Sequence, residues 1–534
     1  MCVMEKFNSF LEWNVYQIYP RSFMDSNVDG IGDIKGITAK LDYLVELGIN
    51  AVWLSPCYKS PNCDNGYDVS DYRDIMDEFG TLDDWKELIE QMHKRGIKLI
   101  MDFVANHTSS EHEWFKQARK SRDNKYHDYY IWRDTPPNDW QSCFLGSAWE
   151  YNKATNEYYL HSFAVGQPDL NFDNPKVRKE MCDIIDYWVD LGVDGFRCDV
   201  LDFIAKDFEK GIMNNAPHVH EYIKELFGRK KVKHIFTVGE CSMGEDKIAD
   251  ICGEDRNELK CIFQFDHLGL GRTGDKFQKA ERDINGLRNT LVKWQYFTEK
   301  NYLLYTLVTD NHDQPHYIER GGNDGKNRYE VATMYAAMFY LLKGIPFIYQ
   351  GIEFGTPDPH YDDINDFDDV ETFNYYNAHK NEIPHDKLME IINFGSRDNV
   401  RRPMCWDNTK NYGFSTADKT WIKPHGKGAE INLENDRNND KSVFRFYKKL
   451  LALRNKSDAV KFGKFEDITH GDGYFAYTRT FGDEQILVVC NFDELREIGG
   501  LPDGEYLFGN SAERKTNGKY SPFEAAVFGI RSKK

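Results

Sequence analysis

Residues 195–200 read Gly195-Phe196-Arg197-Cys198-Asp199-Val200. We expect this run to form a short buried strand, and because side chains alternate along a strand, Arg197 and Asp199 would lie on the same face. An unpaired carboxylate is costly to bury, so the neighbouring arginine would keep Asp199 ionised and hydrogen-bonded. An isolated pair of this kind is usually a structural ion pair. Whether this pair is structural or part of an active site depends on whether other strands bring carboxylates to the same place.

Eight such apolar runs alternate with segments of helical period. The expected strands are 15–19, 51–54, 98–104, 195–200, 235–240, 261–266, 303–308 and 346–350. The expected helices are 34–47, 82–95, 176–191, 216–227, 328–342 and 442–454. Apolar strands separated by helices indicate a parallel sheet that is buried on both faces, and eight such units predict an α/β fold, a closed (β/α)8 TIM barrel. In that fold the active site is built from the C-terminal ends of the strands.

Three stretches depart from a minimal barrel. Residues 106–172 follow the third strand, are too long for a connecting loop and are rich in aromatic residues, so we expect an inserted subdomain over the active site. A second insertion with little clear period, at about 352–436, follows the eighth strand. Residues 457–534 contain alternating runs between turns and predict a C-terminal antiparallel β-domain. The catalytic barrel would then comprise residues 1–105 and 173–456.

The composition argues against several kinds of partner. The formal charge is −19 and no basic stripe is present, so we expect no binding of nucleic acid. No apolar run approaches the roughly 20 residues that span a bilayer, and the N-terminus has no secretory pattern. The 11 cysteines are odd in number and form no C-x-x-C pair, which is typical of buried thiols in a reducing compartment. We therefore expect a cytoplasmic monomer with no membrane partner.

Polar side chains lie at or just beyond the C-terminal ends of four of the expected strands. They are Asp102 and Asn106-His107 for the third strand, Asp199 for the fourth, Glu240 for the fifth, and Asp310-Asn311-His312-Asp313 for the seventh. Convergent carboxylates without a metal-binding pattern indicate acid/base and nucleophilic chemistry on a neutral polar substrate, with no catalytic cofactor. Two carboxyl groups suffice for glycoside hydrolysis. Asp199, beside Arg197, suits the nucleophile, whereas Glu240 has no adjacent basic residue and would be kept protonated by desolvation.

These strand ends resemble the signature regions of the α-amylase family of glycoside hydrolases. The similar segments are Asp102-Phe103-Val104-Ala105-Asn106-His107, 195–200, Val238-Gly239-Glu240 and Asn311-His312-Asp313. The resemblance covers nearly the whole chain and is greatest for the oligo-1,6-glucosidase and α-glucosidase branch, through 167–171 and 311–315. It implies a retaining enzyme that releases glucose from the non-reducing ends of short α-glucosides. Asp199 would be the nucleophile, Glu240 the general acid/base, and Asp313 would bind and distort the sugar.

The resemblance also implies which residues bind the substrate. The expected subsite for the terminal glucose consists of Asp64, Tyr67, His107, Arg197, His312 and Arg401. Gln167 is a further candidate, although a loop residue without substrate contact is an open alternative. In similar enzymes a valine after the nucleophile, here Val200, accompanies cleavage of α-1,6 links, and alanine or threonine accompanies α-1,4 links. A β-branched wall beside the bond would bias the choice by about 1–3 kcal/mol, so we expect a preference for isomaltose, isomalto-oligosaccharides and panose.

Related activities stay open beside this one. A trehalose-6-phosphate hydrolase would need cationic groups near the second sugar, and an α-1,4-glucosidase or transglucosidase would share the mechanism. Sucrose isomerases are similar but carry an arginine-rich segment where this chain has residues 319–324, which argues against isomerisation. Non-enzymatic heavy chains of amino-acid transporters resemble the barrel but lack the full set of carboxylates and carry a membrane anchor. That different class is not expected here.

A separate acidic stretch, residues 25–33, predicts a metal site. Oxygen-bearing side chains at every second residue and Gly30 at the sixth position match the first part of an EF-hand-like loop, although the closing glutamate is absent. The similar enzymes carry a metal in this loop. The resemblance therefore implies a structural calcium ion, and a solvated acidic turn is the alternative. The implied ligands are Asp25, Asn27, Asp29, the carbonyl of Ile31, and Asp33.

Overall fold

The computed structural model describes residues 9–531 except 242, 254–255, 257 and 275. Its centre is a parallel sheet of eight strands. In sheet order these are β11 (Cys261–Ile262), β10 (Phe236–Gly239), β9 (Gly195–Asp199), β5 (Lys98–Val104), β2 (Ala51–Leu54), β1 (Val15–Ile18), β13 (Ile345–Tyr349) and β12 (Thr306–Val308). The eight strands and the barrel fold predicted from the sequence are confirmed. Several strands are shorter than expected, and β11 comprises only two residues.

The strands follow one another around the barrel in chain order. Val15 of β1, for example, is paired with Ala51 on one side and with Phe347 on the other. Among the described residues, β11 and β12 share no backbone ladder. The hydroxyl of Thr306 spans this seam, because it lies 3.3 Å from both the carbonyl oxygen of Ile262 and the backbone nitrogen of Gln264. A single side chain therefore helps to close the barrel.

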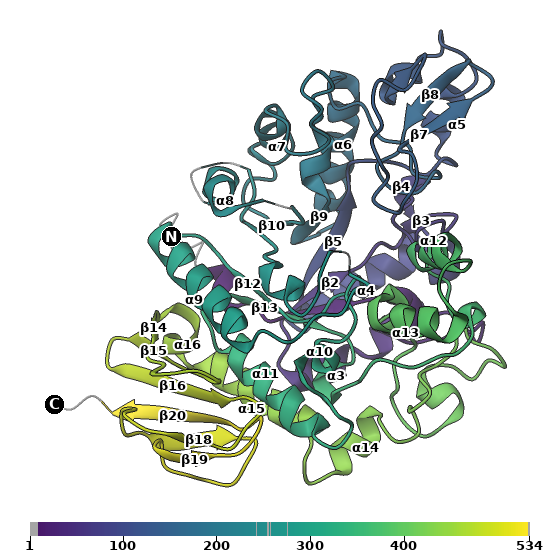
Figure 1. The fold of residues 1–534 in the computed structure, drawn as a ribbon. Helices are drawn as coiled ribbons and strands as arrows, with labels where there is room; N and C mark the ends of the chain where they lie inside the picture. The colour runs from purple at the N-terminus through teal and green to yellow at the C-terminus, as the bar shows by residue number, and fades with distance from the viewer. Residues whose placement is uncertain (1–8, 242, 254–255, 257, 275, 532–534) are drawn as a thin grey trace.

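Helices surround the sheet (Figure 1). They include α4 (Leu82–Lys94), α6 (Pro175–Asp190), α7 (Val219–Phe227), α8 (Glu245–Ile251), α9 (Ile284–Lys300), α11 (Arg328–Tyr340) and α15 (Val443–Lys456). The single helix expected at 34–47 is wrong. It is divided into α2 (Ile34–Ala39) and α3 (Leu41–Leu47) because Lys40 has φ −104° and ψ 6°. The apolar period continues across this turn, so the pattern alone could not reveal the break.

The long segments outside the barrel have their own elements. Residues after β5 form α5 (Glu113–Ala118) and an antiparallel sheet of β6 (Trp132–Arg133), β8 (Glu157–Leu160) and β7 (Trp149–Asn152). The excursion after β13, which showed little period in the sequence, contains α12 (Val370–His379), α13 (His385–Gly395) and α14 (Leu433–Asn438). The C-terminal antiparallel sheet is confirmed. It consists of β14 (Lys464–Asp467), β15 (Tyr474–Phe481), β16 (Glu484–Asn491), β20 (Ala525–Arg531) and β18 (Glu505–Gly509).

The interior of the barrel is apolar over most of its depth and polar at one end. Val15, Ile100, Phe236 and Phe347 belong to one buried cluster that the strands enclose. Nearer the C-terminal ends of the strands, the indole nitrogen of Trp53 donates to a carboxylate, and ionisable side chains replace the apolar ones. The core therefore supports a rim on which charged groups are held in fixed positions.

The described helices and cysteines give two further findings. In the part of the chain that the structure describes, no helix combines the length and the apolar character that crossing a bilayer requires. The ten described cysteines are all free, and eight of them are buried.

Candidate active site

Arg197 is the centre of the polar rim. Its side chain is 1% exposed, and its Nη1 atom donates to Oδ1 of Asp102 at 2.9 Å and to Oδ1 of Asp199 at 2.7 Å. Its Nη2 atom donates to Oε2 of Glu240. Burial acts to lower the pKa of Arg197, but the neighbouring carboxylates, Asp102 foremost, hold the pKa well above its usual value. One guanidinium thus joins carboxylates from three adjacent strands.

The environment of Glu240 differs from the expectation. The sequence suggested that no basic group lies beside Glu240, and this is wrong, since Arg197 reaches it from the neighbouring strand. Burial nevertheless raises the pKa of Glu240 to about 7, with Arg197 acting in the opposite direction. The expectation that Arg197 keeps Asp199 ionised is also wrong, since burial raises the pKa of Asp199 well above its ordinary value and Arg197 offsets this effect only in part. One positive charge cannot balance three carboxylates, so the pair of Asp199 and Glu240 retains a proton near neutral pH.

Asp313, in the loop after β12, has the opposite environment. Its Oδ2 atom lies 3.0 Å from Nε2 of His312, and its Oδ1 atom lies 3.0 Å from Arg401 and 3.4 Å from Arg397. Burial acts to raise the pKa of Asp313, but His312 and the two arginines lower it well below the ordinary value. This carboxylate is therefore ionised while its neighbours across the pocket share a proton.

His312 is held in one tautomer. The amide nitrogen of Gln17 donates to Nδ1 of His312 at 2.8 Å, so the proton of the neutral ring is on Nε2 and points to Asp313. Burial lowers the pKa of His312, which keeps the ring neutral. Tyr67 stacks on the same ring, with centroids 5.2 Å apart and planes 7° apart. Together these contacts leave His312 one orientation.

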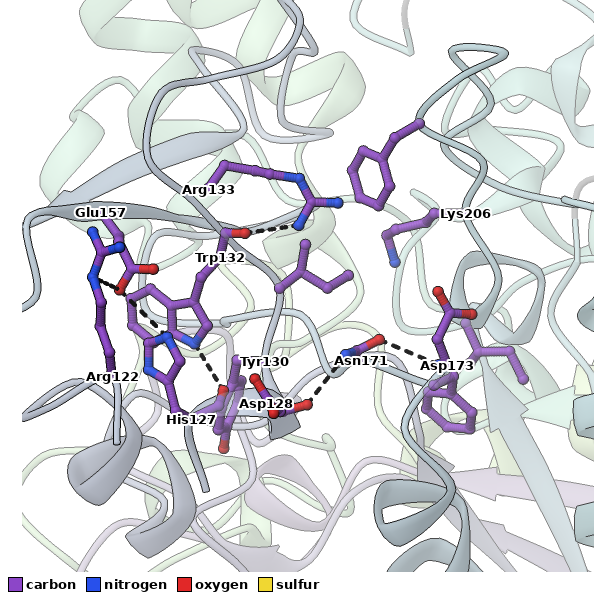
Figure 2. A pocket seen from close by; sticks show the side chains of 14 residues that line it. Arg122, His127, Asp128, Tyr130, Trp132, Arg133, Glu157, Asn171, Asp173 and Lys206 are labelled. Atoms are coloured by element: carbon purple, nitrogen blue, oxygen red, sulfur yellow. Dashed lines mark hydrogen bonds and ion pairs between the residues drawn. The ribbon is translucent and has the colours of Figure 1, made fainter. Parts of the chain in front are cut away.

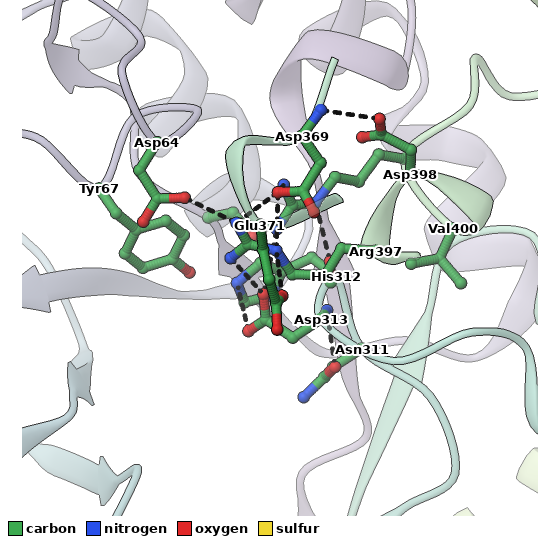
Figure 3. A network of polar contacts seen from close by, with 12 residues as sticks. Asp64, Tyr67, Asn311, His312, Asp313, Asp369, Glu371, Arg397, Asp398 and Val400 are labelled. Carbon is green, nitrogen blue, oxygen red and sulfur yellow. Dashed lines mark hydrogen bonds and ion pairs between the residues drawn. The ribbon is translucent and has the colours of Figure 1, made fainter. Parts of the chain in front are cut away.

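A second network of polar contacts surrounds Arg397 (Figure 3). Arg397 contacts Oδ1 of Asp64 at 2.9 Å, pairs with Asp369, and lies 3.4 Å from Glu371. The amide of Gln167 donates to the other oxygen of Asp64 at 3.1 Å. Burial raises the pKa of Asp64 to about 6, despite Arg397. These contacts join the loop between β3 (Tyr58–Lys59) and β4 (Asp71–Ile75) to the excursion after β13.

The rim encloses a pocket of about 220 Å³. Of the expected residues, those that line it are Asp64, Tyr67, His107, Asp199, Val200, Glu240, His312 and Asp313. Those that lie behind its wall are Gln167, Arg197 and Arg401, which hold the lining carboxylates in place. Sequence reasoning missed the lining residues Cys143, Phe144, Phe163, Lys276, Gln314, Glu371 and Arg397. Phe144 and Phe163 lie in the aromatic-rich segment 106–172, which is the one signal that could have suggested them.

The turn after Asp199 is strained. Val200 has φ 34° and ψ 46°, in the left-handed region that β-branched residues avoid at a cost of about 1–3 kcal/mol. The next residue, Leu201, donates its backbone N–H to the carbonyl of Glu240 at 3.2 Å. The turn thus places the Val200 side chain in the pocket wall beside both rim carboxyls.

The acidic loop at 25–33 is held by hydrogen bonds to its carboxylates. Asp25 accepts three from the backbone, and Asp33 accepts two more. Gly30 is required, because φ is 87° and a Cβ atom would lie 2.1 Å from the carbonyl oxygen of Lys419. Within the described ranges, no three His, Cys, Asp or Glu side chains are placed to hold a metal ion. The oxygen donors suit calcium chemically, and the calcium site stays a prediction.

A separate cavity of about 390 Å³ lies between the segment after β5 and the loop after β9 (Figure 2). Several of its charged groups take part in ion pairs. Glu157 lies 3.3 Å from both Arg122 and His127, and Lys206 lies 2.9 Å from Asp169. None of the rim carboxylates lines this cavity, so it is not part of the candidate active site.

Comparisons with known proteins agree with this geometry. The sequence model described as the alpha-amylase catalytic domain matches residues 17–463. An oligo-1,6-glucosidase from Parageobacillus thermoglucosidasius is 46% identical, over 97% of this chain and 98% of that protein. A trehalose-6-phosphate hydrolase from Bacillus subtilis is 40% identical, over 96% and 97%. A crystal structure of the trehalose-6-phosphate hydrolase from Bacillus licheniformis superimposes with a TM-score of 0.93 at 38% identity, over 98% of this chain and all of that one. The chain therefore belongs to the alpha-amylase family of glycoside hydrolases.

Proposed function

We propose that the protein is a retaining α-glucosidase that releases glucose from the non-reducing ends of short α-glucosides and prefers α-1,6 links. The observation that supports this most is the sharing of Arg197 by Asp199 and Glu240. Carboxyl groups that bind two nitrogens of one guanidinium lie close together, as the two-step retaining mechanism requires. The ion pair of Asp64 and Arg397 lines the pocket, and we infer that it blocks a sugar chain from continuing beyond the terminal glucose.

The environments of the carboxyl groups suggest their roles. Glu240, with a pKa of about 7, would donate a proton to the glycosidic oxygen while Asp199 attacks the anomeric carbon. The leaving sugar departs with that proton and the glucose remains bonded to Asp199. Glu240, now ionised, would take a proton from water, which attacks the same carbon and releases glucose. Asp313, ionised and held by His312 and Arg401, would accept hydrogen bonds from the sugar hydroxyls throughout.

The charges around the pocket favour a neutral second sugar over a phosphorylated one. Among the described residues that line the pocket, the cations are Lys276 and Arg397. Lys276 is paired with Glu371, and Arg397 is surrounded by carboxylates. Neither cation is left to hold a phosphate. The relatives named oligo-1,6-glucosidase, such as those from Parageobacillus thermoglucosidasius and Bacillus cereus, further support neutral α-1,6 substrates.

The role of Asp199 can be tested by replacing it. Asp199→Asn keeps the shape but removes the nucleophile, so kcat/KM on isomaltose should fall by about 10⁴-fold or more. Asp207→Asn is the matched control, because Asp207 lies on the following loop and pairs with the exposed Lys210. Undiminished turnover by Asp199→Asn, with glucose release measured enzymatically, would contradict the mechanism.

The raised pKa of Glu240 predicts the alkaline side of the pH profile. The general acid must be protonated, so kcat/KM on isomaltose should fall about tenfold per pH unit once the pH rises through about 7. Glu240→Gln should lose this dependence and slow hydrolysis by about 10²- to 10⁴-fold. A profile that stays flat to pH 9 in the unmodified enzyme would show that Glu240 is not the acid.

Val200 tests the preference for linkage. The unmodified protein should have a higher kcat/KM for isomaltose than for maltose, and Val200→Ala should reduce that ratio by about 10- to 200-fold because a methyl wall is removed beside the bond. Val200→Gly should reduce the ratio similarly without lowering the melting temperature, since glycine tolerates the left-handed turn. A clear preference of the unmodified protein for maltose would refute the proposed specificity.

We also propose that the loop at 25–33 binds calcium in a structural role. Its oxygen donors and its required glycine support this, and no catalytic step depends on it. Calcium should raise the melting temperature of protein that has been treated with a chelator, and Asp25→Asn should reduce the increase. Identical melting curves with calcium and with chelator would contradict the calcium site and would show that the loop is a solvated acidic turn.

A further inference from the structure

A cavity of about 630 Å³, larger than the catalytic pocket, lies beside α10 (Tyr317–Gly321) and α13. It shares no lining residue with the catalytic pocket. Its lining includes Lys279, Arg320, Asp358, Met389, Glu390 and Phe394. The segment 319–324 contributes Glu319 and Arg320 to this second cavity.

Arg320 is incompletely satisfied. It is 9% exposed, and its Nη1 atom donates to the carbonyl oxygen of Leu268 at 2.6 Å. Its Nε and Nη2 atoms have no hydrogen-bond acceptor anywhere in the described part of the chain. Unpaired buried donors are uncommon and costly in native proteins. Both nitrogens are shielded from solvent by protein atoms, so an acceptor in the adjoining cavity would reach them only after a movement of the cavity wall.

The charges of the lining indicate what kind of molecule could enter. Five carboxylates, those of Glu319, Asp358, Asp362, Asp386 and Glu390, face two cations, Lys279 and Arg320. This excess of negative charge disfavours an anion. A hydroxyl group accepts from a guanidinium and also donates to a carboxylate, so a polyhydroxyl molecule matches both kinds of lining group. Met389 and Phe394 add an apolar surface of the kind on which a sugar ring packs.

Arg272 stands between this cavity and the catalytic pocket. Its Nη1 atom donates to Oε1 of Gln314 at 2.6 Å, and Gln314 lines the catalytic pocket. Its guanidinium lies 5.9 Å from the ring centroid of Phe394, which lines the second cavity. A ligand that moves Phe394 would therefore also change the position of Gln314, because the side chain of Arg272 contacts both residues.

We propose that this cavity is an accessory site for a neutral saccharide such as isomaltose, separate from the catalytic pocket and joined to it through Arg272. The proposal goes beyond the proposed hydrolysis, and the class of ligand follows from the lining of the cavity itself. Occupancy of the site would alter the position of Gln314 and thus the binding of the leaving sugar.

The test requires a blocked catalytic pocket. A fluorinated glucosyl fluoride, whose fluoride departs as Asp199 attacks, would leave one sugar on the enzyme, and mass spectrometry would verify the labelling. Saturation-transfer NMR with isomaltose should then still detect binding to the labelled protein. If no labelling occurred, that result would contradict the proposed mechanism but not the accessory site. The accessory site would then be tested by the same NMR experiment on Asp199→Asn, with a tight competitor bound in the catalytic pocket.

Variants locate the binding. Phe394→Ala should abolish the signal from the labelled protein, and Glu390→Gln should weaken it severalfold. Glu382→Gln is the matched control, because its side chain is 75% exposed, like that of Glu390, but lies outside the cavity. No signal from labelled unmodified protein, a signal unchanged in Phe394→Ala, or stronger binding of glucose 6-phosphate than of isomaltose would each overturn the proposal.

Discussion

The guanidinium of Arg197, held among three carboxylates, is the interaction on which the active site depends. The parallel register sets it in place, because Asp102 of β5 is the direct partner of Arg197 in the ladder and Asp199 follows two residues later on the same face. Glu240 joins from the next strand, where its backbone N–H donates to the carbonyl of Cys198 at 2.8 Å. Without Arg197, the three carboxylates would be buried with no counter-charge. Strand pairing, which is the basis of the fold, is therefore also the basis of the chemistry.

The division of roles follows from an uneven distribution of charge. On one side of the pocket a single arginine serves three carboxylates, and burial there raises the pKa of Glu240 to about 7. On the other side Arg397 and Arg401 both reach Asp313, and its pKa is lowered well below the ordinary value. Two groups of the same chemical type thus differ in protonation at one pH. One can give a proton while the other binds hydroxyls as an anion.

Much of this arrangement can be predicted from the sequence. Apolar runs mark the strands, a period of two places Arg197 beside Asp199, and barrel topology brings strand ends together. The sequence could not show which residues that are distant along the chain contact one another in the fold. Glu240 receives its arginine from the neighbouring strand. Arg397 reaches Asp64 from more than three hundred residues away, out of an excursion whose helices have weak period.

The same limit applies to Gln167 and Val200. The resemblance to known enzymes marked Gln167 as a substrate-binding candidate, and the structure places it behind the pocket wall, where it holds Asp64. No sequence pattern indicates that Val200 adopts a left-handed conformation, since β-branched residues favour extended backbone. The turn is held open by neighbours, including the backbone of Glu240, that are distant in sequence.

The most direct test of two carboxyl groups acting around one arginine is the configuration of the glucose first released from isomaltose. Proton NMR, recorded before mutarotation, distinguishes the α anomer from the β anomer. Asp199 attacks the face opposite the leaving sugar, and water then attacks the face that the leaving sugar vacated, so the anomeric carbon is inverted twice and α-glucose should appear first. Initial release of β-glucose would show a single displacement by water and would contradict the role of Asp199 as nucleophile.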